Sequence, residues 1–254
     1  TSGATWAACR TCGDGGAYAQ LDGIVHFAVD PNNPANETIA DLELAPRNAE
    51  GLVTFSSDFR MLRPVDANLG NRRILMDIPN RGKPLALRNI NSAPDVSPEA
   101  PMDLGNGFLM RQGYTVVWCA WQHDVPDVPG MLRINLPEAV KNDRPISGMI
   151  VVTFQLNAPW RVEFLSSRNR RPYPANDVAD QTAVMTVQEH EDAPEEIIPR
   201  ERWSFARLEN GRAVPDASHV YLASGFQPGK VYQVIYATTG APVVGLGQVA
   251  TRDM

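Results

Sequence analysis

The sequence contains few of the residues on which metal and redox chemistry depend, since its 254 residues include three cysteines and four histidines. Cys9 and Cys12 have the spacing of a redox pair or of half a zinc site, but no matching ligand pair follows them. We therefore interpret them as incidental small residues or as a local disulfide. The acidic segment around His190 combines one histidine with scattered carboxylates, which is a poor transition-metal signature. Neither a metal nor a cofactor is expected.

The sequence also lacks an excess of positive charge and any long apolar run. Its formal net charge is −6 at pH 7, which argues against nucleic acid and anionic membranes as partners. No uninterrupted apolar run is long enough to span a bilayer, so a soluble globular chain is expected. No signal peptide stands at Thr1. Because a mature exported protein has already lost its signal, the localisation stays open and includes the periplasm and the exterior of the cell.

The chain is organised around residues 71–124. Arg72–Ile78 is an apolar run of strand length, and the prolines and the glycine of Pro79–Pro84 end it. Tyr114–Trp121 is almost continuously hydrophobic, which is typical of a strand buried on both faces. Two such strands that are separated by a helix form a parallel pair with a crossover connection.

The predicted crossover helix is Pro101–Gln112. Its apolar residues share one helical face, Asp103 is suited to cap its start, and Gly113 is suited to end it. In parallel sheets, ligands bind at the carboxyl ends of the strands. Those ends are Asn80–Gly82 and Gln122–Asp124.

Strands are predicted on both sides of this region. The predicted N-terminal strands are Leu21–Val29, Ile39–Leu44 and Leu52–Phe59, with a turn at Asn48–Gly51 that allows a hairpin between the last two. The later strands are Leu132–Leu136, Ser147–Gln155, Ala183–Gln188 and Val231–Ala237. Gly245–Asp253 is the expected start of a helix.

These patterns predict an α/β fold with a large, mainly β insertion. We divide the chain into N-terminal β segments (1–70), core strands with their helix (71–130), the insertion (131–240) and the start of the next core helix (241–254). Two or more long helices within 131–240 would contradict the insertion.

Several segments resemble a family of bacterial proteins known as α/β-hydrolase domain proteins. They read ILMDIPNRGKPLAL, GNGFLMRQGYTVVWCAWQHDVP, GLGQVATRDM, LDGIVHFAVDPNNPAN, DLELAPRNAEGLVTFSSDFRMLRPVD and GFQPGKVYQVIYAT. The resemblance spans nearly the whole chain but only the front part of the family's chain. It implies an incomplete α/β-hydrolase-type sheet, with the segment at Gly245 leading to a strand and to the nucleophile elbow beyond Met254.

No nucleophile is recognisable in the chain itself. The α/β-hydrolase signal is Gly-x-Ser-x-Gly after a strand, and the sequence contains none. Ser224 lacks the first glycine and is followed by a turn. His123 and Asp124 point to opposite sides of a strand, so they cannot orient each other as a catalytic dyad.

The resemblance assigns the chain the oxyanion side of the site. One oxyanion donor in α/β-hydrolases is a backbone N–H in the loop after the third strand. Arg81 and Gly82 occupy that position and are the candidate donors. Asn80, Trp121 and Gln122 are the candidate substrate-binding residues. Arg81 also allows two other interpretations, a bidentate contact with a substrate carboxylate or a surface ion pair.

Two functions are therefore carried forward. The first is part of a serine hydrolase, a carboxylic-ester hydrolase, that supplies the oxyanion strand and a pocket-capping insertion. Its partners would be a small-molecule ester and the missing C-terminal portion of the same protein, and the chain alone would be inactive. The alternative is a non-catalytic, β-rich binding or scaffolding module.

Overall fold

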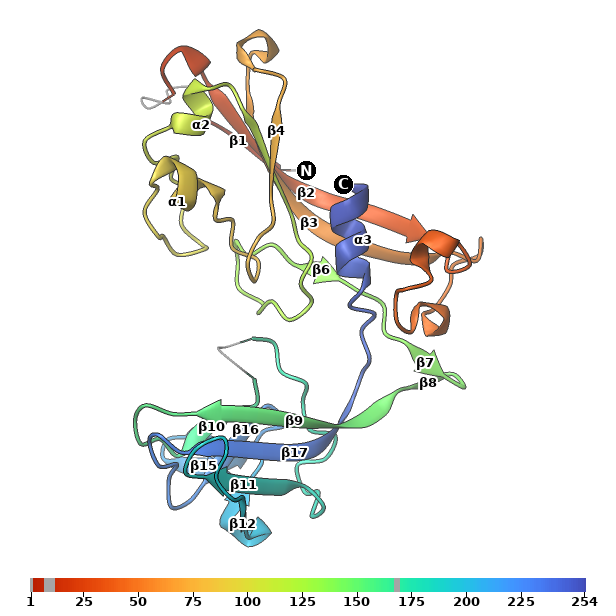
Figure 1. Cartoon of the computed structure of the whole chain (residues 1–254), viewed down its shortest axis with the longest axis vertical. Coiled ribbons are helices and arrows are strands. Elements are labelled where there is room, and N and C mark those ends of the chain that lie inside the picture. Colours follow the sequence, from red (N-terminus) through yellow and green to blue (C-terminus); the bar gives the residue numbers. More distant parts are fainter. Residues whose placement is uncertain (1, 7–11, 167–169) are drawn as a thin grey trace. The chain divides into compact units, whose positions relative to one another are not determined.

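The computed structural model describes residues 2–6, 12–166 and 170–254. The protein is mainly β, with 37% of residues in strands against 14% in helices, and it has several antiparallel sheets and one small mixed sheet. Its contacts divide it into two units, residues 1–139 with 242–254, and residues 140–241. Figure 1 shows the elements of each unit. Each unit is described by itself below.

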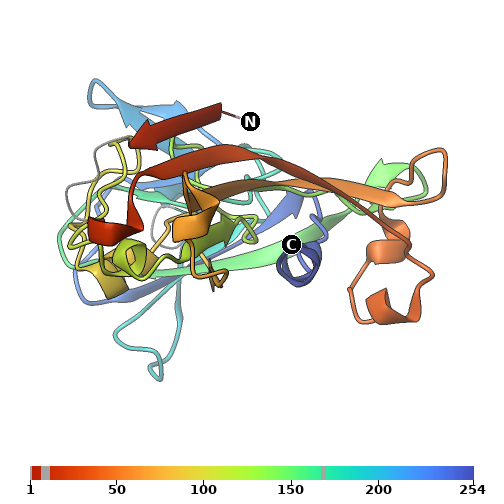
Figure 2. The same ribbon diagram turned by 90° about the horizontal axis from the view of Figure 1, so that it is seen from above.

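Unit 1 holds the mixed sheet, whose strands run in the order β1-β2-β3-β5-β4, with β6 paired to β3. The strands are β1 (Ser2–Trp6), β2 (Tyr18–Val29), β3 (Val53–Pro64), β4 (Ile74–Asp77), β5 (Thr115–Cys119) and β6 (Ile134–Asn135). β2 and β3 pair antiparallel along all twelve residues of each strand, and Figure 2 shows this long ribbon from above. β4 and β5 pair in parallel, which confirms the predicted neighbours.

Helices cover both faces of this sheet. They are α1 (Ala86–Asn91), α2 (Phe108–Arg111) and α3 (Leu246–Asp253), and Figure 1 shows α1 and α2 on one side and α3 on the other. The Sγ atom of Cys119 lies 4.0 Å from the Ala250 carbonyl oxygen, so that face of β5 packs on α3. Neighbouring Trp118 points to the opposite face because side chains alternate along a strand. α3 confirms the helix expected at Gly245–Asp253.

The predicted crossover helix Pro101–Gln112 is wrong in most of its length. Gly105 and Gly107 have φ of +58° and +72°, which are not helical, so regular helix begins only after them, at Phe108. Asp103 does not cap a helix, since its Oδ1 accepts a hydrogen bond from the Gly105 N–H of a turn at 2.7 Å. The stop at Gly113 is confirmed, with φ of +73° just beyond the end of α2.

Two further expectations in this unit are wrong. Ile39–Leu44 is not a strand, because Asp41 takes a φ of +60° and Leu42–Leu44 forms a single 3-10 turn. Consequently β3 pairs with β2 rather than in a hairpin with that segment. β5 lies inside the sheet, since β3 and β4 flank it. β4 is an edge strand, and Ile74 on it is 69% exposed.

Unit 2 consists of antiparallel sheets around one aromatic-rich core. Its strands are β7 (Val140–Lys141), β8 (Arg144–Pro145), β9 (Ser147–Gln155), β10 (Val162–Phe164), β11 (Val184–Gln188), β12 (Glu196–Ile198), β13 (Trp203–Ser204), β14 (Ala206–Glu209), β15 (Arg212–Pro215), β16 (His219–Leu222) and β17 (Val231–Thr239). The larger sheet has the order β12-β11-β17-β9, and the smaller one β10-β16-β13. Among its described residues the unit has no α-helix.

The core of unit 2 lies between these strands. Phe226 is 1% exposed, and its ring lies edge-on to Phe154 and Tyr232, with centroids at 5.3 and 5.0 Å. Edge-to-face pairs of this kind add to the hydrophobic stabilisation of burial. Trp203 belongs to the same cluster and is 3% exposed. A tryptophan therefore reports on the packing of this core.

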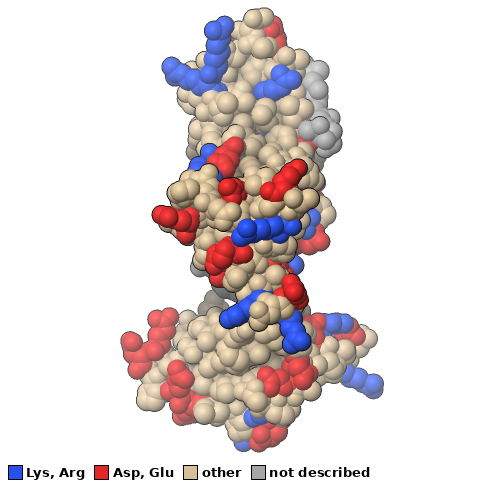
Figure 3. All heavy atoms as spheres, turned by 90° about the vertical axis from the view of Figure 1, so that its right-hand side faces the viewer, with Lys and Arg blue, Asp and Glu red and all other residues tan. Residues whose placement is uncertain are grey.

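Both acidic and basic side chains are scattered over the face drawn in Figure 3. Within the described residues, no helix combines the length and apolar character needed to cross a bilayer.

Truncation of the core phenylalanine is the first test of this packing. Phe226→Ala should lower the free energy of unfolding by about 3–5 kcal/mol, because it removes a buried ring and leaves a cavity. Denaturant unfolding followed by tryptophan fluorescence measures the loss. The matched control is Phe108→Ala, whose ring is 45% exposed and which should cost less than about 1 kcal/mol. Equal losses in the two variants would contradict the assigned core.

Candidate functional site

A tight turn at the carboxyl end of β4 forms the candidate site. Asn80 and Lys83 close it with two backbone hydrogen bonds of 3.2 Å, one in each direction. The two residues between them, Arg81 and Gly82, have φ of +52° and +77°. This is the backbone of the mirror-image turns that favour glycine. Successive N–H groups in such turns form concavities that bind anions.

Side chains from the end of β5 hold this turn. The Arg81 N–H donates to Gln122 Oε1 at 2.6 Å, and the Arg81 guanidinium forms an ion pair with Asp124 Oδ1 at 2.7 Å. The structure thus brings together the two strand ends that the sequence predicts as neighbours. A non-glycine residue at positive φ costs free energy, and these two contacts fix Arg81 in that conformation.

The second N–H of the turn is open. Among the described residues, the Gly82 N–H makes no hydrogen bond. The Gly82 carbonyl is occupied, since it accepts from the Leu132 N–H at 2.9 Å. A Cβ on Gly82 would lie 2.7 Å from the Leu132 carbonyl oxygen and 2.8 Å from Val125 Cγ1. Only glycine combines this conformation with this close approach.

The three candidate substrate-binding residues, Trp121, Gln122 and Asn80, contact the turn in different ways. Trp121 donates from Nε1 to the Pro79 carbonyl at 2.8 Å, so its indole fastens the end of β5 to the end of β4. The side chain of Gln122 contacts the turn backbone as described above. Asn80 is exposed and joins the turn through its backbone.

Asp77 has a structural role that was not predicted from the sequence. Its Oδ2 accepts from the Leu85 and Ala86 N–H groups at 2.9 and 2.7 Å and from Trp118 Nε1 at 2.5 Å. One carboxylate therefore joins the end of β4, the middle of the sheet and the first turn of α1. The only local signal was an acid at the end of an apolar run.

A second polar cluster lies in unit 2. His219 Nδ1 lies 2.9 Å from Asp216 Oδ1, and Arg207 contacts Asp216 Oδ2 at 2.7 Å. Burial alone would raise the pKa of Asp216, but hydrogen bonds from His219, Arg207 and the Ser218 N–H lower the pKa to about 2. The structure describes no hydroxyl or thiol bonded to the His219 ring. The cluster therefore lacks the nucleophile of a catalytic triad.

No metal-binding group emerges from the described residues, where no three His, Cys, Asp or Glu side chains are placed to hold an ion. Cys9 lies outside the described residues. Cys12 is disulfide-bonded, which excludes it as a thiolate ligand. Cys119 is a free, buried thiol, and burial raises its pKa.

The turn geometry predicts a large difference between two glycines. Gly82→Ala should destabilise the protein by about 2 kcal/mol more than Gly51→Ala, because only the first adds a clash to the strain of positive φ. Gly51 has a φ of +81° but open space around it. Thermal unfolding of both variants measures the difference. Similar melting temperatures would show that the turn does not pack as described.

The ion cluster of unit 2 predicts a pH dependence. Because the pKa of Asp216 is about 2 in the folded protein and about 3.9 in an unfolded chain, its stabilisation is complete above the unfolded value. It is lost as the pH falls toward 2. The gap in unfolding free energy between the native protein and Asp216→Asn should therefore narrow from about pH 5 to about pH 2. Denaturant unfolding at several pH values measures it, and a constant gap would contradict the assigned contacts.

Comparisons with known proteins add no assignment to this geometry. The chain matches no protein-family model, no curated protein and no solved structure. The interpretation of the turn therefore depends on the residues and distances described above.

Proposed function

We propose that this chain supplies the oxyanion-binding turn of a serine hydrolase, a carboxylic-ester hydrolase whose nucleophile lies on a segment after Met254. The observation that carries the proposal is the open Gly82 N–H in a turn with two successive positive φ angles at the carboxyl end of a parallel strand. Ligands bind at this end of such sheets. The sequence resemblance to α/β-hydrolase domain proteins favours the same role.

The chemistry required of the turn is electrostatic. When a nucleophile attacks an ester carbonyl, the carbonyl oxygen gains negative charge in the tetrahedral intermediate. A fixed backbone N–H directed at that oxygen stabilises it by about 3 kcal/mol. Gly82 offers such a donor and has no side chain of its own. Gln122 Oε1 is an oxygen acceptor at the adjacent Arg81 N–H, and it occupies one position that a substrate oxygen could take after the side chain turns away.

The edge position of β4 fits the same proposal. Among the described residues, β4 pairs with β5 alone, and Ile74 and Ile78 are 69% and 45% exposed. Exposed apolar strand edges are suited to pair with a further strand. A parallel strand on this side of β4 would end beside the Asn80–Lys83 turn. A serine that follows such a strand would then lie close to the Gly82 N–H.

The test compares the 254-residue chain with a protein extended to the natural stop codon. The extended protein should hydrolyse a short-chain aryl ester and react with a fluorophosphonate, which labels activated serines. The shorter chain should do neither, because an oxyanion donor without a nucleophile gives little rate over water.

Glycine variants of the extended protein test the turn directly. Gly82→Ala keeps the N–H, but its Cβ would lie 2.7 Å from the Leu132 carbonyl oxygen and should displace the donor from its position. We expect kcat to fall by about 100-fold with a smaller change in KM, since the donor acts on the transition state. Gly51→Ala is the control and should keep kcat. An extended protein that folds but neither hydrolyses ester nor reacts with the probe would favour the non-catalytic module. Equal turnover by the short chain would reveal another nucleophile, with Ser224 the first residue to mutate.

A further inference from the structure

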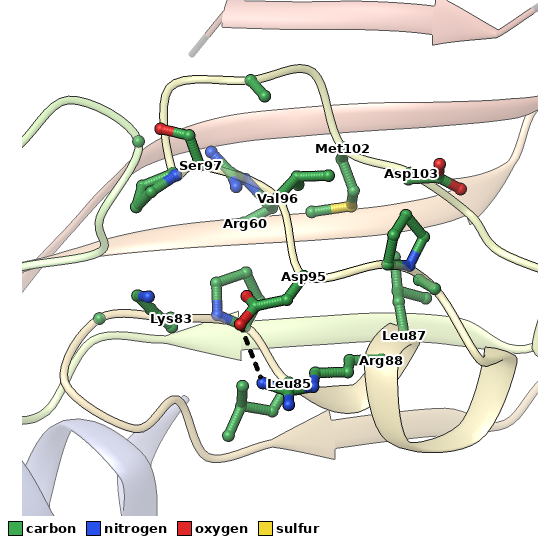
Figure 4. A pocket seen from close by; sticks show the side chains of 17 residues that line it. Arg60, Lys83, Leu85, Leu87, Arg88, Asp95, Val96, Ser97, Met102 and Asp103 are labelled. Carbon is green, nitrogen blue, oxygen red and sulfur yellow. Dashed lines mark hydrogen bonds and ion pairs between the residues drawn. The ribbon is translucent and has the colours of Figure 1, made fainter.

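A hollow beside the candidate turn contains an arginine whose hydrogen-bonding capacity is only partly used. The hollow lies between the start of α1 and the loop of residues 93–103, and Gly82 and Lys83 form part of its wall. Arg60 reaches it from β3, and its side chain is 15% exposed. Figure 4 shows Arg60 and Lys83 toward one end of the hollow and Asp103 toward the other.

The guanidinium of Arg60 makes one ion pair, from Nε to Asp22 Oδ1 at 2.5 Å. Among the described residues, neither Nη group of Arg60 has a hydrogen-bond partner. A guanidinium carries five N–H donors, and the two Nη groups account for four of them. Neither Nη atom is among the described polar atoms that are buried without a partner, so both are accessible to a ligand that enters the hollow. Their fork geometry matches a carboxylate, which accepts two parallel hydrogen bonds.

Lys83 adds a second cation at the same end. No carboxylate of the described residues lies within ion-pair distance of its Nζ. The third cation of the lining, Arg88, is already paired with Asp95 at 3.2 Å. Asp103 uses Oδ1 to accept from the Gly105 N–H. What remains available is therefore the ammonium group of Lys83 and the two Nη groups of Arg60, whose Nε is paired with Asp22.

A neighbouring hollow over β2 and β3 shares Arg60 but suits an anion less. It is lined by the carboxylates of Asp22 and Asp58 as well as by Arg60. Asp22 faces Arg60 directly in the β2–β3 register. Like charges this close oppose an incoming carboxylate. An anion that uses the free Nη groups is therefore favoured in the hollow beside Lys83.

The rest of the lining is suited to an apolar chain. Leu85, Leu87 and Met102 line the hollow together with several prolines and alanines. Pockets for small molecules commonly combine an apolar wall with a few polar groups that fix orientation. We propose that this hollow binds a small carboxylate with a short aliphatic chain, and that Arg60 and Lys83 hold its carboxylate group. The proposal extends the proposed function, because the hollow adjoins the turn, but binding can be measured without turnover.

The test uses the 254-residue chain and pentanoate as the probe, with pentanamide as its uncharged counterpart. Backbone NMR shifts of Gly82, Lys83 and Leu87 during titration give the dissociation constants. Pentanoate should shift these signals saturably and bind about tenfold more tightly than pentanamide, because charge-assisted hydrogen bonds are the stronger ones. Absence of saturable shifts, or equal binding of the two probes, would overturn the proposal.

Variants then identify the residues responsible. Arg60→Gln should weaken pentanoate binding about tenfold, and Lys83→Gln about threefold. Arg63→Gln is the matched control, because this exposed arginine lies on the same strand with its side chain on the opposite face. It should change affinity less than twofold.

Arg60→Gln also removes the ion pair with Asp22. Circular dichroism therefore checks whether this variant folds. If Arg60→Gln does not fold, Arg60→Lys is measured in its place, since lysine keeps the positive charge but lacks the paired donors of a guanidinium. It should bind pentanoate several-fold more weakly than the native chain. Unchanged affinity in Lys83→Gln and in the folded Arg60 variant, or an equal loss in Arg63→Gln, would overturn the assignment. Failure of ester hydrolysis in the extended protein would leave this result unaffected and would count against the proposed function alone.

Discussion

The carboxylate of Asp77 is the interaction on which the organisation of unit 1 most depends. β4 has four residues and, within the part of the chain that the structure describes, one partner strand, so its ladder alone is a weak attachment. Asp77 adds hydrogen bonds from Trp118 on that partner and from the Leu85 and Ala86 N–H groups at the start of α1. Hydrogen bonds to a charged acceptor are roughly twice as strong as neutral ones. The segment from 78 to 84 thus becomes a closed loop with both ends fixed.

Fixing this loop makes the Asn80–Lys83 turn rigid at a point where its own backbone is strained. Arg81 at φ of +52° is held from two directions by Gln122 and Asp124. Gly82 is held from a third direction by the hydrogen bond between its carbonyl and the Leu132 N–H. Residues with strained backbone angles persist only where contacts with the surrounding structure hold them in that conformation. The result is a preorganised N–H at Gly82, and preorganisation is what an electrostatic catalyst requires.

The sequence predicted those elements whose signal is local. β4, β5, β9, β11, β17 and α3 follow from apolar runs or from alternation, and Gly113 follows from helix-stop chemistry. The helix at Pro101–Gln112 failed because apolar spacing at residues 104–109 looked helical while Gly105 and Gly107 imposed positive φ. α1 was missed because its start depends on Asp77, a residue nine positions before Ala86. Arg81, Gly82 and Gln122 could be expected to meet because the carboxyl ends of parallel strands meet. The contacts of Asp77 and Arg60 depend on partners that are distant in sequence.

The register of the sheet places two charged side chains, Asp77 and Arg60, on one face, where they have different roles. Asp22, Arg60, Trp118 and Asp77 form one continuous row across β2, β3, β5 and β4. At one end of the row, Asp77 receives three donors from the protein. Arg60, in the middle, gives one of its donors to Asp22 and keeps two Nη groups without a partner among the described residues. A charged group whose hydrogen bonds the protein supplies stabilises structure, whereas one with unused donors is available to an external partner. The same row that fixes the candidate turn therefore also supplies the cation that faces the hollow beside it.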